Sequence, residues 1–284
     1  MKTEVLEYLR CPACGGGLNL EDEEREGLEV LSGKLTCREC KRGYEIAHGL
    51  PNLVYPEPKK LPEMDAKFLE QYERIASRYD RDIRRMALCL GIWEPRARRR
   101  ELVEPLELKP GHWVLEVGAG TGSNLVTIAE QVGKGGKLFA LDLSPGMLAV
   151  AREKLKRRGI EAEFALGNAT YLPYKDELFD AVLHFGGINT FGEKGRAIAE
   201  MVRVAKPGAK IVIGDEGLAP GKERTRFGRW LLKQNRLFAS KPPKELIPNE
   251  ATEFRLRWVW RGTFYIMEFR KSRPRKGSVF EGNR

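Results

Sequence analysis

Three glycines at alternate positions, Gly118, Gly120 and Gly122, follow a carboxylate, Glu116, in the run VLEVGAGTG. Between a buried strand and a helix, such glycines let the backbone turn tightly and approach a ligand closely. About twenty residues later an apolar strand ends at Asp142, whose carboxylate can accept hydrogen bonds from two ribose hydroxyls. Because position 123 is Ser, the spacing is G-x-G-x-G and disfavours a nicotinamide dinucleotide.

This constellation resembles the first two motifs of the class I S-adenosylmethionine-dependent methyltransferases. The pentad ASRYD, residues 76–80, is similar to the stretch before the sheet in quinone-biosynthetic methyltransferases, where an aromatic closes over the cofactor. The resemblance implies that Asn168, in GNAT, reads the adenine amino group through its side-chain oxygen. It implies a cofactor site of Tyr79, Glu116, Gly118, Gly120, Asp142, Leu143, Met147, Asn168, Ala169 and His184. Tyr79, Leu143 and Met147 could equally be core residues.

Four polar residues are expected at the carboxyl ends of the fourth and fifth strands, where loops line the active crevice of a parallel sheet. They are His184, Asn189, Asp215 and Glu216, our candidate catalytic residues. His184 could take a proton from the methyl acceptor, or could merely bond the cofactor or backbone. Adjacent strand residues point in opposite directions, so only one of Asp215 and Glu216 is expected to face a substrate.

Four cysteines form two C-x2-C pairs, Cys11 with Cys14 and Cys37 with Cys40. The pattern predicts a structural zinc site with four protein ligands, and iron is a minor option. Strands at residues 27–31, 34–36 and 44–47 would form a ribbon, whereas the acidic run 21–26 is expected to be a solvated loop or a protein contact. The ribbon resembles zinc platforms of tRNA and protein methyltransferases and the ribbon fused to bacterial rRNA guanine methyltransferases. Cys89 is expected to be a buried apolar residue.

The alternation of strands and helices predicts an α/β fold with a doubly wound, mostly parallel seven-stranded sheet, as in Rossmann-like methyltransferases. A hairpin at residues 254–269 would supply the antiparallel last strand. Helices are expected at residues 64–90, broken near Asp80, and at 96–106, where clustered arginines could grip phosphates or face solvent. We expect a zinc ribbon (1–55), an extended linker (56–63), a methyltransferase domain (64–271) with a helical lid (64–106) and a basic insert (217–253), and a basic flexible tail (272–284).

The formal charge of +10 is unevenly spread. Residues 1–55 have seven Lys or Arg against ten Asp or Glu, so residues 56–284 hold the whole positive excess. The insert mixes cations with aromatics at residues 222–238, which suits RNA or an amphipathic helix seated on the domain. No signal peptide or spanning segment is evident, so we expect a cytoplasmic protein without a membrane partner. Abundant charge and few amides suggest a thermophilic source.

These features favour an S-adenosylmethionine-dependent methyltransferase that modifies a base of structured RNA, with ribosomal RNA ahead of tRNA. A small-molecule methyltransferase of the quinone-biosynthesis type is the rival, because ASRYD is present and HFGGIN, residues 184–189, lacks the motif typical of base-amine methylation. A third alternative is a noncatalytic RNA-binding or assembly factor that retains a cofactor site.

Overall fold

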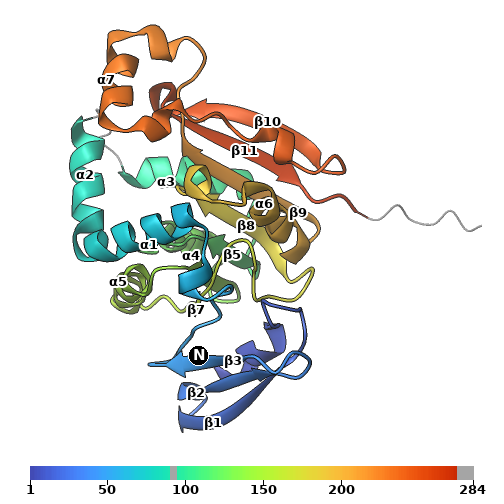
Figure 1. Cartoon of the computed structure of the whole chain (residues 1–284). Coiled ribbons are helices and arrows are strands. Elements are labelled where there is room, and N and C mark those ends of the chain that lie inside the picture. Colours follow the sequence, from blue (N-terminus) through green and yellow to red (C-terminus); the bar gives the residue numbers. More distant parts are fainter. Residues whose placement is uncertain (90–94, 274–284) are drawn as a thin grey trace, which may run out of the picture.

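The computed structural model describes residues 1–89 and 95–273 (Figure 1). It contains a four-stranded sheet near the N-terminus and a seven-stranded sheet in the remainder of the chain. The expectations for the Cys89 and Arg96 side chains and for the tail beyond Arg273 fall outside the described residues. None of the helices in the described ranges combines the length and apolar character that a membrane crossing needs.

The larger sheet has the expected doubly wound order, β10-β11-β9-β8-β5-β6-β7. Five strands pair in parallel, in the order β9-β8-β5-β6-β7. Strand β11 is antiparallel to both β9 and β10, and this arrangement confirms the predicted fold class. The bounds are β5 Trp113–Val117, β6 Lys137–Asp142, β7 Glu163–Leu166, β8 Phe179–Phe185, β9 Ala205–Glu216, β10 Thr252–Val259 and β11 Phe264–Arg270.

Apolar side chains cover both faces of this sheet, because alternate residues of a strand point to opposite sides. In β5, Val114 packs into a core with α3 (Pro95–Val103) and α4 (Ser123–Val132). Its neighbour Leu115 packs into the opposite core, which includes α6 (Lys194–Val204) and the N-terminal ribbon. The continuous apolar composition of the central strands follows from this two-sided burial.

The helical lid is α1 (Glu63–Ile75), a short 3-10 turn, and α2 (Tyr79–Cys89), so the expected break falls immediately before Asp80. Two carboxylates on α1 fasten it. Glu73 accepts hydrogen bonds from Ser144 and from the Gly146 amide, 2.9 Å away, at the N-terminus of α5 (Pro145–Lys156). Asp65 accepts one at 2.9 Å from the Gly192 amide. These contacts hold the lid over the carboxyl edge of the sheet.

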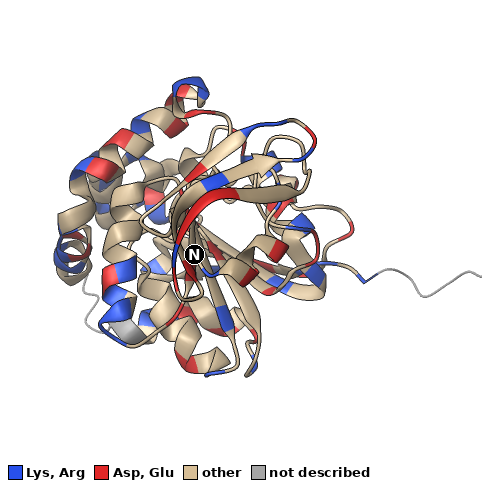
Figure 2. Cartoon of the chain, turned by 90° about the horizontal axis from the view of Figure 1, so that it is seen from below, with Lys and Arg blue, Asp and Glu red and all other residues tan. Residues whose placement is uncertain are grey.

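The ribbon has four strands instead of the expected three: β1 (Leu18–Glu26), β2 (Glu29–Cys37), β3 (Gly43–Ala47) and β4 (Leu50–Pro51). The prediction that the acidic run is a loop was wrong, because it lies in β1. Hydroxyl groups of the hairpin partner strand bond to it: Thr36 donates to Glu21 and Ser32 donates to Glu24 across the strand pair. The run is exposed, as its charge requires, and Figure 2, seen from the ribbon side, shows acidic residues along these strands.

The segment after the ribbon is exposed at residues 57–60 and includes a short turn, so it is only in part the extended spacer that its prolines suggested. Pro58–Lys60 forms a 3-10 turn, Leu61 is buried, and the Tyr55 ring meets the Tyr171 ring edge-on at 4.9 Å between centroids. The domain boundaries themselves stay a prediction.

The ribbon and the larger sheet share one hydrophobic core. Tyr8 packs edge-on against Trp113 of β5, with ring centroids 4.9 Å apart, and Leu9 and Leu53 are fully buried. Backbone bonds join the two parts, since the Leu53 amide donates to Leu166 at 2.9 Å and the Arg10 amide to Pro173 at 3.0 Å. The ribbon is therefore an integral wall of the larger fold.

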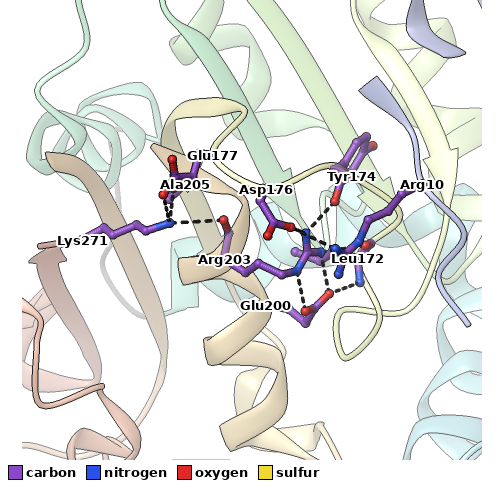
Figure 3. Close-up of polar contacts among 9 residues, drawn as sticks. All are labelled: Arg10, Leu172, Tyr174, Asp176, Glu177, Glu200, Arg203, Ala205 and Lys271. Carbon is purple, nitrogen blue, oxygen red and sulfur yellow. Dashed lines mark hydrogen bonds and ion pairs between the residues drawn. The ribbon is translucent and has the colours of Figure 1, made fainter. Parts of the chain in front are cut away.

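A polar cluster reinforces this junction (Figure 3). The Arg203 guanidinium of α6 forms a bidentate pair with Glu200 and also donates to Asp176 and to the carbonyls of Leu172 and Tyr174. Arg10 of the ribbon donates to the same Asp176 at 2.9 Å. The cluster ties the ribbon, α6 and the loop between β7 and β8 together.

The basic insert contains one α-helix, α7 (Arg226–Gln234), capped by Thr225, whose hydroxyl accepts from the Gly228 amide. Leu231 and, after the helix, Phe238 are buried in the core that includes α3 and α4, whereas Trp230 is exposed. The helix is therefore amphipathic and seated on the domain, with its cations outward.

Replacing Arg203 by Ala should destabilise the protein by about 3 kcal/mol, because a largely buried carboxylate and two carbonyls lose their donor. Urea unfolding followed by circular dichroism measures the change. The matched control is Arg157→Ala, whose exposed pair with Glu153 should contribute no more than about 0.5 kcal/mol. Equal effects of the two substitutions would contradict a buried, interlocked role for Arg203.

Candidate functional site

The glycine turn between β5 and α4 is held open by backbone bonds to β6. Gly118, Gly120 and Gly122 all have positive φ, between 53° and 68°, which explains the glycines. A Cβ on Gly118 would also lie 3.2 Å from the His184 ring. Asp142 accepts the Gly120 amide at 2.7 Å with one oxygen and the Ser144 amide at 2.9 Å with the other. The turn and Asp142 are thus fixed relative to each other before any ligand arrives.

A cavity of about 270 Å³ opens beside this turn, under the lid. All ten residues expected to hold a cofactor line it, although they come from α2, α5 and the carboxyl ends of four strands, β5, β6, β7 and β8. Two of the four candidate catalytic residues, His184 and Glu216, line it as well. Their placement agrees with the predicted site, whereas their individual roles stay predictions.

Glu116 is a buried carboxylate beside a buried cation. Its Oε1 accepts from Asn124 at 2.7 Å, and its Oε2 is buried without a hydrogen-bond partner among the described residues. Arg99 of α3 donates to the same Asn124 at 2.6 Å. Burial raises the pKa of Glu116 to about 8, although Asn124 and Arg99 favour the ionised form. A ligand ammonium group would satisfy the unpartnered oxygen.

The side-chain oxygen of Asn168 is already bonded within the protein, so its predicted use to read an adenine amino group has no support here. Oδ1 accepts from the Thr170 amide at 3.0 Å and the Thr170 hydroxyl at 2.8 Å. Because a backbone amide can only donate, Thr170 fixes this orientation of the side chain. Nδ2 is left buried and without a partner in the described structure. It can donate to a ring nitrogen of a base, and it cannot accept from an amino group.

His184 is fully buried at the end of β8. Its Nδ1 lies 2.7 Å from the Val117 carbonyl, an acceptor, so Nδ1 carries the proton and Nε2 is the basic nitrogen. Burial lowers the pKa of His184, which keeps the imidazole neutral. Nε2 has no partner in the described part of the chain, so it is available to a ligand.

Of the two adjacent candidates on β9, Glu216 lines the cavity and Asp215 does not, as their positions on a strand predict. Asp215 is buried and accepts from the amides of Gly187 and Asn189, while Asn189 bonds the Glu216 carbonyl and the Tyr265 hydroxyl. Neither residue lines the cavity, so their expected contact with a methyl acceptor has no support here; they brace the loop after β8. Glu216 faces the cavity, where burial and then Asp215 raise its pKa.

Part of the cavity lining is apolar and aromatic. It combines lid residues with residues in and after β8 and around the β10–β11 turn, and consists of Phe68, Tyr72, Ile83, Met86, Phe185, Phe191, Trp260 and Phe264. Asp65, Arg98 and Glu216 also line the cavity. The cavity therefore joins a polar region suited to a nucleoside and an amino acid with a region suited to a flat, apolar molecule.

The four ribbon cysteines converge on one point, with their sulfur atoms within 4.8 Å of one another. Cys11 and Cys40 sulfurs are 3.7 Å apart, and those of Cys14 and Cys37 are 3.5 Å apart. Tetrahedral zinc with bonds of about 2.3 Å requires sulfur separations of about 3.8 Å. The cluster thus fits structural zinc, and the Tyr44 hydroxyl, 3.1 Å from the Cys11 sulfur, can donate to that thiolate.

Arg99 and the lid aromatics were not among the expected site residues. Arg99 was grouped with solvated or phosphate-binding arginines, yet it lines the cavity. Its spacing from Leu102, Val103 and Leu106 places it on the apolar side of α3, which is the signal that could have identified it. The apolar periodicity of α1 predicts that Phe68 and Tyr72 lie on the buried face of the helix. It does not show that this face covers a cavity.

The family models that match this chain distinguish the same two regions as the structure does, the ribbon and the larger sheet. Residues 114–208 match the family model of a methyltransferase domain, and residues 2–49 match that of the Trm112p-like proteins. The first match covers the sheet from β5 to β9, and the second covers the zinc ribbon.

Known proteins similar to this chain are mainly methyltransferases. A demethylmenaquinone methyltransferase of Bacillus cytotoxicus is 35% identical over 142 residues, 50% of this chain and 58% of the relative. That of Renibacterium salmoninarum is 38% identical over 163 residues, 57% and 64% of the two chains. The chain thus spans less than two thirds of these relatives.

A solved structure shares the fold. Phosphoethanolamine N-methyltransferase 2 of Haemonchus contortus, in complex with S-adenosylmethionine, superposes with a TM-score of 0.53 at 16% identity, covering 62% of this chain and 53% of that one. The chain therefore joins a Trm112p-like zinc ribbon region to a region that matches the methyltransferase domain family and has the Rossmann-like methyltransferase fold.

Proposed function

We propose that this protein transfers a methyl group from S-adenosylmethionine to a small, largely apolar acceptor. The observation that carries the proposal is the single cavity with two unlike walls, one around Glu116 and Asp142 and the other built from aromatic side chains. The quinone methyltransferases among the similar proteins support an acceptor of this class. This was the rival hypothesis from the sequence.

The polar wall matches the parts of S-adenosylmethionine group by group. Asp142 is placed to accept from ribose hydroxyls, Asn168 Nδ2 to donate to the adenine ring, and Glu116 to bind the ammonium group. Glu116 Oε2 and Asn168 Nδ2 are buried without a partner among the described residues, and such a group is costly. The Asp142 oxygens each accept one amide bond and can accept more. Bound there, the sulfonium would supply an activated methyl group with a good leaving group.

On the acceptor side, the residues position the substrate and manage its proton. The aromatic wall excludes water and can stack a flat ring against the methyl donor. Among the cavity groups that can receive a proton, Glu216 and the basic Nε2 of His184 are our candidates to take it from a hydroxyl or ring carbon of the acceptor. Asp215 and Asn189 support this arrangement from behind, by fixing the loop after β8.

A base of structured RNA is the second candidate acceptor, with ribosomal RNA ahead of tRNA as the sequence suggested. The exposed cations of α7 and the exposed Trp230 favour it, because RNA binding uses cations for phosphates and aromatics for bases. The apolar acceptor wall favours the small molecule.

Cofactor affinity should increase with pH between about 6 and 8. In the free protein Glu116 is protonated below its pKa of about 8, and a bound ammonium favours its ionised form, so binding releases a proton. The affinity should gain up to about tenfold per pH unit and level off above the pKa. Calorimetric titration of S-adenosylmethionine across this range measures the slope.

The matched variants are Glu116→Gln, which should bind weakly and lose most of the pH dependence, and Glu130→Gln on the exposed side of α4, which should keep it. An affinity independent of pH in the unmodified protein would contradict the placement of the ammonium beside Glu116.

Methyl transfer to an apolar acceptor can be measured with labelled S-adenosylmethionine and 1,4-naphthohydroquinone as the probe. We expect labelled product, and Glu216→Gln should lower kcat by about 100-fold if Glu216 receives the proton. Glu223→Gln, an exposed carboxylate outside the cavity, should leave kcat unchanged. Label found in total cellular RNA and in no apolar acceptor would overturn the proposed substrate class.

A further inference from the structure

Exposed apolar side chains border the mouth of the cavity. Met86 of α2 lines the cavity and yet is 41% exposed, and Leu88, two residues further on, is 53% exposed. Arg84 shares a helix face with Leu88 and is also exposed. Arg98 and Trp260 also line the cavity, and Arg98 lies over the Trp260 ring, 5.8 Å from its centroid. The residues around the cavity thus include both cations and exposed apolar groups.

This border continues onto α7 through stacked side chains. Arg261, next to Trp260, lies 5.5 Å from the centroid of the Phe227 ring. Phe227 in turn stacks on Trp230, with ring centroids 6.0 Å apart and planes at 20°. Trp230 is 45% exposed. Figure 1 shows α2 and α7 on the same side of the molecule, so the entrance and α7 form one surface.

The cations of this surface are largely free of carboxylate partners. Within the described residues, Arg84, Arg229 and Lys233 have no ion pair, and Arg229 bonds only the Arg224 carbonyl. We call Arg84, Met86, Leu88, Arg229, Trp230 and Lys233 the entrance rim.

We infer that the entrance rim docks on the surface of an anionic lipid bilayer, from which an apolar acceptor enters the cavity. This inference rests on the proposed function, because an acceptor that matches the aromatic wall is poorly soluble in water. Lys and Arg attract anionic headgroups, while tryptophan and aliphatic side chains insert at the headgroup boundary. Such a contact needs no spanning helix, so it revises the expectation of no membrane partner.

RNA would also meet the cations, but it would leave Met86 and Leu88 without an apolar environment. A bilayer matches both kinds of side chain and places the cavity mouth against the phase that dissolves the acceptor. The exposed apolar groups at the mouth therefore favour the lipid surface over the nucleic acid.

Co-sedimentation with vesicles tests the inference on the full chain. The protein should bind vesicles of equimolar phosphatidylcholine and phosphatidylglycerol, bind phosphatidylcholine alone much more weakly, and lose affinity with added salt. The double variant Arg229→Glu/Lys233→Glu should lower partitioning by at least about tenfold, and Trp230→Ala should also weaken it. The matched control, Arg157→Glu/Arg158→Glu in the turn after α5, makes the same charge change at exposed residues outside the rim and should bind as the unmodified protein does.

Methylation assays with a soluble and a vesicle-held acceptor distinguish failure of the docking surface from failure of the proposed function. The rim variants should methylate a water-soluble hydroquinone normally and lose activity on a long-chain hydroquinone held in anionic vesicles. If no acceptor is methylated, the proposed function fails, and sedimentation alone still decides the docking surface. Equal binding of rim and control variants would overturn the inference, as would rim variants that lose tRNA binding but keep vesicle binding.

Discussion

The need to satisfy polar groups buried at the carboxyl edge of the parallel sheet governs the rest of this structure. Glu116, Asp142 and His184 lie at the carboxyl ends of β5, β6 and β8, where Glu116 and His184 are buried and Asp142 is half-buried. Backbone amides and Asn124 satisfy part of their bonding capacity, and the glycine turn makes room for a ligand to satisfy the rest. The cavity is thus polar where its groups lack partners and apolar where the lid closes it.

The ribbon contributes to this edge from outside. It pairs with Leu166 at the end of β7 and with Pro173 further along the same loop, so both ends of the segment that holds Asn168 are anchored to it. Tyr8, Leu9 and Leu53 extend the sheet's own core into the ribbon. Zinc, by holding the ribbon together, would help to fix the segment that faces the adenine.

Short sequence patterns were sufficient to predict those parts of the candidate site whose residues lie within one short segment. The glycine turn, Asp142 and the cysteine pairs each follow from spacing within a few residues, and the strand order follows from alternation and handedness. The division between Asp215 and Glu216 followed from strand geometry alone.

Features that depend on packing between distant segments were missed or wrong. The acidic run forms a strand because β2 supplies partners, and Tyr55, at the start of the proline-rich segment, packs on Tyr171. Neither outcome is determined by composition within the segment itself. The orientation of Asn168 and the inward position of Arg99 were also missed, although Thr170 and the apolar residues of α3 lie nearby in the sequence.

The central claim is that one ligand, S-adenosylmethionine, satisfies the buried polar groups beside the glycine turn. Calorimetric titration of the unmodified protein and of Asp142→Ala tests it most directly. The account predicts one binding site in the unmodified protein and no measurable binding in the variant, with the fold intact by circular dichroism. Unchanged affinity of a folded Asp142→Ala protein would contradict it.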